Sequence, residues 1–208
     1  MLMVTRLKEM PRPIYVSMAL TKKGIQLKNA GLRLHIPVSP IRPLSLIEGM
    51  IHDCAISKNW IIFILLPLCV SLDRLKQGGK HFMWDSDLPM CLGLLPRNNP
   101  KSDDIRWYPY TPESFIGHIG NAFDIDEQNV CLDTPLENGN VFGAFFPTDK
   151  NEAPQPGTVT SRFVRFHIDT TKKSGTFVGE PEELIPVNGG MPRIDDRYGL
   201  SVRCALMS

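Results

Sequence analysis

The sequence predicts an all-β protein made of short antiparallel strands. Pro (18) and Gly (16) are plentiful among the 208 residues, which favours turns and short strands over long helices. Apolar runs of strand length recur along the chain, and Pro, Gly and Asn separate them. One short stretch has the pattern of a helix. The length fits one domain, or one large piece of a bigger domain.

The predicted strands follow one another along most of the chain. The final strand shows the alternation of a strand that packs on one main face, because Val164, Phe166 and Ile168 share one parity. The strands that we expect are Leu32–Ile36, Trp60–Leu66, Met90–Leu95, Ile105–Tyr108, Ile116–Phe123, Val130–Leu132, Val141–Phe146 and Val159–Ile168.

The stretch Ser71–Gly78 predicts a connecting helix of one or two turns, with Ser71 as its N-cap and a Gly-Gly stop. Just before it, Trp60–Val70 is the most apolar run, but it is too short to cross a bilayer and contains Pro67. It predicts a buried strand that ends in a turn. Because Met1–Pro13 has no signal-peptide pattern either, we expect a cytoplasmic protein without a transmembrane segment. Peripheral contact with a membrane stays open.

The composition excludes several classes of protein. With 42% hydrophobic and 22% charged residues, the chain is neither a disordered tail nor a coiled coil. Lys and Arg (23) nearly balance Asp and Glu (22), so the net charge of +1 gives no electrostatic reason to expect nucleic acid as a partner. The five cysteines are odd in number and form no C-x-x-C pair, which indicates buried free thiols in a reducing compartment.

Five histidines are the candidates for chemistry. His35 and His167 lie at polar positions of their strands beside arginines, so we expect both to face solvent. His52, His81 and His118 lie in richer contexts, but no two of them have the spacing of a metal motif. Only the fold could bring His52 and His118 together.

Five stretches of the chain, three of which contain one of these histidines, resemble the carotenoid cleavage oxygenase family, particularly its lignostilbene-dioxygenase and isoeugenol-monooxygenase-like branch. The most specific are Met50–Trp60 (MIHDCAISKNW) and Gly117–Ala122 (GHIGNA), because order, spacing and flanking strands agree. The others, in family order, are Leu66–Leu68 with Asp73–Asp85, Gly93–Arg97 with Ile105–Trp107, and Met191–Arg197.

The resemblance implies a seven-bladed β-propeller with Fe(II) on its axis, held by four histidines from different blades. Residues 1–208 would form part of this domain, without its N-terminal and C-terminal blades. His52 matches the second ligand and His118 the third, whereas His81 matches no ligand position and is expected to be structural. Four neutral imidazoles leave coordination positions for O2. The implied activity is that of a dioxygenase, which cleaves a conjugated C=C bond of a stilbene, phenylpropenoid or apocarotenoid to carbonyl products.

Two departures from the family pattern support an alternative. The chain matches only two of the four ligand positions, and Gly190 stands where the family generally carries a glutamate that orients a ligand histidine. The alternative is therefore a catalytically inactive propeller fragment. A structural zinc site that uses Cys54 beside His52 ranks last, because no further residue completes the pattern. We expect core packing for Phe115, Ile116 and Phe123, with substrate contact as the second reading.

Overall fold

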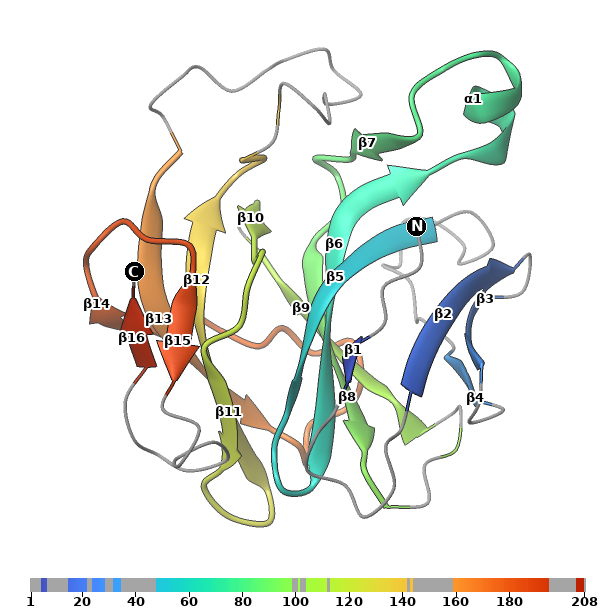
Figure 1. Ribbon diagram of the computed structural model, residues 1–208. Coiled ribbons are helices and arrows are strands. Elements are labelled where there is room, and N and C mark those ends of the chain that lie inside the picture. The colour runs from blue at the N-terminus through green and yellow to red at the C-terminus, as the bar shows by residue number, and fades with distance from the viewer. Residues whose placement is uncertain are drawn as a thin grey trace.

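Sixteen strands and one short helix make up the described part of the fold (Figure 1). The computed structural model describes residues 5–6, 15–21, 24–28, 32–34, 48–98, 101, 104–111, 113–141, 143, 159–194 and 205–207. The elements are β1 (Thr5–Arg6), β2 (Tyr15–Thr21), β3 (Gly24–Lys28), β4 (Leu32–Leu34), β5 (Glu48–Ile56), β6 (Trp60–Val70), α1 (Leu72–Lys76), β7 (Phe82–Trp84), β8 (Met90–Pro96), β9 (Arg106–Tyr110), β10 (Ser114–Phe115), β11 (Asn121–Asp124), β12 (Asn129–Asn138), β13 (Ser161–Asp169), β14 (Glu182–Ile185), β15 (Pro192–Ile194) and β16 (Ala205–Met207).

The strands form consecutive antiparallel sheets. The first has the order β1-β2-β3-β4, the second β5-β6-β8-β9 with β7 on β6, and the third β10-β12-β13-β14 with β11 on β12. Strands β15 and β16 pair separately. Sheets of about four sequential antiparallel strands are the blades of a β-propeller. The predicted all-β class and its blade architecture are confirmed.

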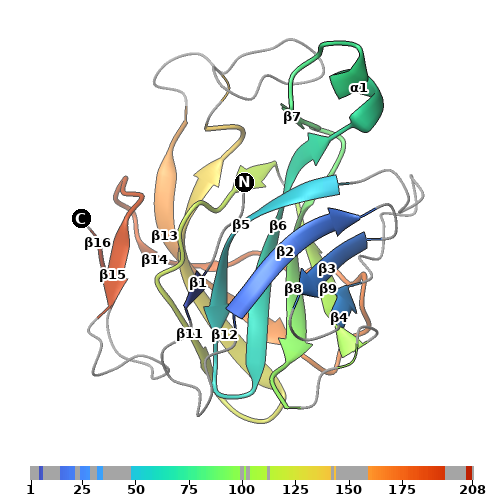
Figure 2. The same ribbon diagram turned by 45° about the vertical axis from the view of Figure 1, so that its right-hand side comes forward.

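The second and third sheets share one hydrophobic core. Strand β6 is buried on both faces: Ile62, Ile64 and Leu66 belong to the shared core, whereas Ile61 and Phe63 belong to a smaller cluster on the other face. A strand buried on both sides is expected to be continuously apolar, which explains the run from Trp60 to Val70. Figures 1 and 2 show that β5 of the second sheet lies beside β11 of the third.

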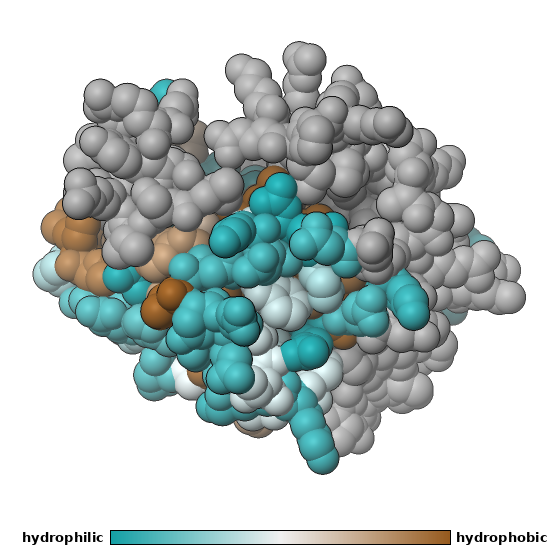
Figure 3. Space-filling model, turned by 90° about the horizontal axis from the view of Figure 1, so that it is seen from below, coloured by the Kyte–Doolittle hydropathy of each residue, from teal (hydrophilic) through white to brown (hydrophobic). Residues whose placement is uncertain are grey.

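The turns after β5 and β11 reach the lower end of the molecule in Figure 1. Seen from below in Figure 3, the described residues of this end are mostly hydrophilic, with hydrophobic residues toward one side. Helix α1 begins as predicted, because the Ser71 hydroxyl accepts a hydrogen bond of 3.2 Å from the Arg74 N–H. No helix in the described part of the chain has the length and apolar character needed to span a membrane.

Two predicted elements differ from the structure. Strand β6 does not end before Pro67 but continues to Val70. Residues before Pro67 pair with β8 and residues after it pair with β7, so Pro67 itself pairs with neither. On the other side of β6, Pro67 lies at a shift of the register with β5. A proline is tolerated at such a bulge, where no ladder N–H is required. The predicted strand Ile116–Phe123 is wrong as well, since only 121–123 of it are extended, in β11. Of the predicted strand Val141–Phe146, all but Val141 and Gly143 lie outside the described residues, and these two are in turns.

Candidate metal centre

The rings of His52 and His118 lie against each other, although they come from different sheets. Their centroids are 5.5 Å apart and their planes meet at 84°, an edge-to-face arrangement. His52 lies within β5, and His118 lies in the segment between β10 and β11. The fold thus brings together the two histidines that the sequence singled out.

His52 lies where the ladder between β5 and β6 is irregular. Ile51 pairs with Leu65 and Cys54 with Phe63, so three steps along β5 oppose two along β6. The extra residue makes a β-bulge at His52 and Asp53. In a regular strand, consecutive side chains point to opposite faces, but a bulge re-aims them. Here both residues contact the segment that carries His118.

His118 lies in a break within the outer strand of its own sheet. Both β10 and β11 pair with β12, and the residues between them, 116–120, leave the ladder. Hydrogen bonds to β12 hold this segment: the Thr134 hydroxyl donates to the His118 carbonyl at 2.9 Å, and the Gly120 N–H donates to the Asp133 carbonyl at 2.9 Å. A Cβ on Gly120 would lie 2.9 Å from the Phe163 ring, so glycine permits this close approach.

Two carboxylates near the site accept hydrogen bonds that join the second sheet to the third. Asp53 accepts hydrogen bonds from the Cys54 N–H (2.8 Å) and, across the sheets, from the Ile119 N–H (3.1 Å). Asp124, at the end of β11, accepts from the Ser57 hydroxyl and the Asn59 N–H in the β5–β6 turn, both at 3.0 Å. Sequence reasoning missed Asp53, although a charged residue within the apolar strand 50–56 was a signal.

The two imidazoles fit a metal ion as part of its donor set. His52 Nδ1 is buried without a hydrogen-bond partner among the described residues, and an unpaired buried nitrogen is costly unless another group satisfies it. Imidazole is a common ligand of iron and zinc. The described residues contain no group of three or more His, Cys, Asp or Glu that could hold a metal. Burial raises the pKa of the Cys54 thiol to about 11, so it is not a thiolate at neutral pH.

The other residues singled out from the sequence lie elsewhere. His167 is exposed, as predicted, and His81 is exposed with its ring 4.5 Å from that of Phe82. His35 lies outside the described residues. Core packing is confirmed for the three apolar residues near His118, which are at most 2% exposed: Phe115, Ile116 and Phe123. Cys54, Cys69, Cys91 and Cys131 are free thiols, as predicted, but only Cys131 is buried; the other three are half-buried.

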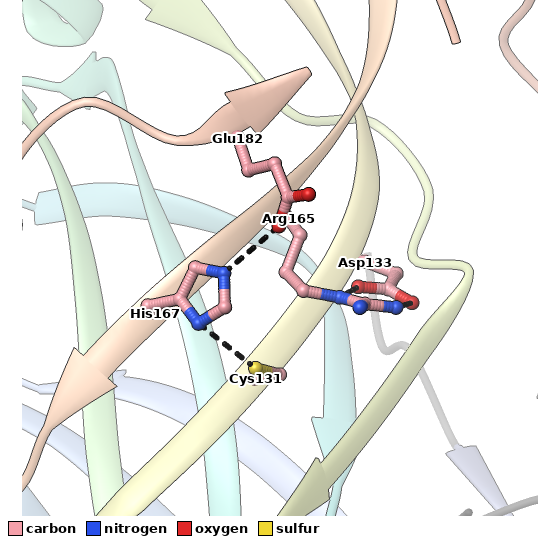
Figure 4. A network of polar contacts seen from close by, with 5 residues as sticks. All are labelled: Cys131, Asp133, Arg165, His167 and Glu182. Carbon is pink, nitrogen blue, oxygen red and sulfur yellow. Dashed lines mark hydrogen bonds and ion pairs between the residues drawn. The ribbon is translucent and has the colours of Figure 1, made fainter. Parts of the chain in front are cut away.

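A second polar cluster lies on the face of the third sheet that points away from the shared core (Figure 4). His167 Nδ1 lies 3.5 Å from Cys131 Sγ, and its Nε2 lies 3.1 Å from Glu182 Oε2. A thiol, an imidazole and a carboxylate in this order could form a nucleophilic triad. However, Cys131 is fully buried and burial raises its pKa to about 11, so this thiol stays protonated. The cluster, with the Arg165–Asp133 ion pair beside it, is structural.

Gly190 has a carboxyl group for a neighbour. A Cβ on Gly190 would lie 3.9 Å from Oε1 of Glu137, which is on β12. Asp195 and Asp196, the nearest acidic residues in the sequence, lie outside the described residues. The position that lacks the expected glutamate side chain is therefore next to the carboxyl group of Glu137 on β12.

Comparison with known proteins assigns the family. The family model described as "RPE65: Retinal pigment epithelial membrane protein" matches residues 8–202, and the chain belongs to this family. Carotenoid cleavage oxygenase 1 of Neurospora crassa is 38% identical over 149 residues, which are 72% of this chain and 28% of the relative. Resveratrol cleavage oxygenase 1 of Aspergillus fumigatus is 36% identical over 73% of this chain and 30% of its own length.

The solved structures agree with the family assignment. Lignostilbene dioxygenase of Pseudomonas brassicacearum superposes with a TM-score of 0.70 at 31% identity, covering 92% of this chain and 36% of that protein. The resemblance to the carotenoid cleavage oxygenases and their lignostilbene branch is confirmed. The chain spans roughly a third or less of the length of these proteins.

Proposed function

We propose that this chain provides His52 and His118 as ligands of Fe(II) in an oxygenase that cleaves the C=C bond of an apolar conjugated alkene with O2. The observation that carries this proposal is the 5.5 Å separation of the two rings, one on β5 of the second sheet and the other on the segment between β10 and β11 of the third. Family membership supports the class of reaction, since relatives are named carotenoid, resveratrol and lignostilbene oxygenases.

The chain's own residues supply the positions of the ligands. The bulge in β5 turns His52 toward the third sheet, and the bonds from Thr134 and Gly120 hold the backbone of His118. Neutral imidazoles would leave the charge of the metal uncompensated and favour the binding of further ligands. When bound, a ferrous ion would supply the activation of O2. Further ligands of a four-histidine site would come from outside the described residues.

The proposed substrate class is a stilbene, a phenylpropenoid or an apocarotenoid, and the products are carbonyl compounds. All three are apolar conjugated alkenes, in agreement with the names of the relatives. Aromatic and polyene substrates would be bound by apolar contact, with few polar groups to orient them. The cytoplasmic location and the assignment of residues 1–208 to one domain stay predictions.

The test uses His52→Ala and His118→Ala in the longest natural protein that contains this chain. Iron is measured after anaerobic loading with Fe(II), and carbonyl products are measured with one alkene of each class. We expect both variants to lose iron and turnover, because each removes a ligand. The matched control is His167→Ala, since this histidine is exposed and its ring contacts Glu182 and Cys131 instead of the ring pair. Turnover retained in either variant would disprove the ligand assignment. A wild-type protein without iron or turnover would instead support the inactive alternative.

A further inference from the structure

The two histidines lie on separate sheets, so their distance depends on contacts that cross between sheets. His52 lies on β5 of the second sheet and His118 beside β11 of the third, and no strand pairing joins these two sheets among the described strands. Packing of apolar side chains brings the sheets together, but it has little directional preference. Directional contacts are needed to fix two rings relative to each other.

Asp53 makes such a contact directly beside both histidines. It follows His52 in β5, and its Oδ2 accepts the N–H of Ile119, the residue that follows His118. Its Oδ1 accepts the N–H of Cys54, which holds the carboxylate against its own strand. A carboxylate can serve both donors at once, because each oxygen accepts independently.

The segment around His118 is already fixed to its own sheet on the other side. Thr134 and Asp133 of β12 bond to the residues on either side of Ile119. The Ile119 N–H lies outside the strand ladder and needs an acceptor from elsewhere, which Asp53 provides. The bond from Asp53 therefore joins a segment held by the third sheet to the bulge of the second.

We propose that Asp53 is a positioning residue, whose carboxylate sets the distance and the angle between the rings of His52 and His118. The part of this role that concerns metal binding rests on the proposed function. The two hydrogen bonds of Asp53 require no metal, because both donors are backbone N–H groups of this chain.

The variant that tests this role is Asp53→Asn. Asparagine has the same shape but one acceptor oxygen, and its NH2 group would face one of the two N–H donors. The matched control is Asp124→Asn, which removes one acceptor from another carboxylate that bridges the same two sheets, from the end of β11 to the β5–β6 turn. A merely structural role predicts the same outcome for both variants.

The first measurement needs no metal: nuclear Overhauser contacts between the ring protons of His52 and His118, in the 208-residue chain. We expect these contacts in the wild type and in Asp124→Asn, because the rings meet edge to face at 5.5 Å, and we expect their loss in Asp53→Asn. Contacts retained in Asp53→Asn, or lost equally in both variants, would overturn the role. If Asp53→Asn does not fold, Asp53→Glu carries the same test, since it keeps both oxygens but displaces them by one methylene.

The second measurement is the affinity of the longest natural protein that contains this chain for Co(II), followed by the visible absorption of the bound ion. Removing a residue that orients a metal-binding histidine typically weakens binding about 10-fold or more. We expect such a loss in Asp53→Asn and none in Asp124→Asn. If the ring contacts follow the expected pattern while the wild type binds no Co(II), the proposal of a metal site fails and the role of Asp53 stands. Equal Co(II) affinity in Asp53→Asn and the wild type would contradict a role at the metal.

Discussion

The carboxyl group of Glu137 is altered by its surroundings. Its Oε2 is buried without a hydrogen-bond partner among the described residues, and burial raises the pKa of the carboxyl from 4.5 to about 7. Burial disfavours the charged form of an acid, which is the physical cause of this direction. Close to neutral pH, Glu137 therefore changes between a neutral and a charged state within the folded protein.

Stability should depend on pH through Glu137. Between pH 4.5 and about 7 the folded protein keeps a proton on Glu137 that the unfolded chain has lost, so the contribution of Glu137 to stability is greatest below pH 4.5 and falls as pH rises to about 7. The total loss amounts to about 3 kcal/mol. Glu137→Gln should flatten this part of the curve, measured by urea unfolding at several pH values. Glu127→Gln, at an exposed position of the β11–β12 turn, is the control and should leave the slope unchanged. An unchanged slope in Glu137→Gln would refute the assignment.

The residues of the site were predictable to different degrees. His52 and His118 were found through the motifs around them, whereas their spacing in the sequence carried no information about their distance. Asp53 could not be assigned a partner, because its bond goes to a backbone N–H of another sheet. The hydroxyl of Thr134 likewise bonds to a backbone group, the His118 carbonyl. Every residue has a backbone carbonyl, so such a partner cannot be identified from residue types in the sequence.

At the scale of single elements, the strand pair β8–β9 depends on a glycine. Gly93 pairs with Trp107, and a Cβ on Gly93 would lie 2.4 Å from the indole ring. Trp107 is 1% exposed and packs within a buried cluster, so the ring has no free space to move into. The glycine in the stretch 93–97 therefore makes room for an aromatic side chain across the sheet.

Gly93→Ala should destabilise the protein by about 1–3 kcal/mol, the usual cost of overpacking a buried site. The measurement is the free energy of unfolding from urea denaturation. The control is Gly190→Ala, whose new methyl group would meet its nearest neighbour, Glu137 Oε1, at an ordinary 3.9 Å. We expect a change within about 0.5 kcal/mol for this control. Equal effects in the two variants would mean that the contact with Trp107 is not responsible.

The predictions of single elements were correct where the sequence pattern was local. They were wrong where the segment is held by hydrogen bonds to a neighbouring sheet. Helix α1 follows from capping, β8 from a short apolar run and β13 from alternation, which are properties of a few consecutive residues. The prediction of a strand at 116–123 failed because this apolar segment is held by bonds to β12 and β5 instead of a regular ladder. The break that carries His118 is thus a tertiary feature.

At the scale of the whole molecule, one core joins the second and third sheets. It includes Ile64 and Leu92 of the second sheet with Leu132 and Phe166 of the third. The ring of Phe166 meets that of Tyr110 edge to face, with centroids 5.2 Å apart, across the two sheets. Because the sheets bury their apolar faces against each other, neither is expected to keep its structure alone.

We expect the two sheets to unfold as one cooperative unit, and Phe166→Ala tests this. The substitution should cost about 3–5 kcal/mol, because it leaves a cavity at the junction of the sheets. The measurement is amide hydrogen exchange. The free energy of opening should fall by a similar amount in β6 and β8 of the second sheet and in β12 and β13 of the third. The neighbouring His167→Ala, on the exposed face of the same strand, should leave protection nearly unchanged. If β6 and β8 keep their protection while β12 and β13 lose it, the two sheets unfold independently and the shared core does not make them one cooperative unit.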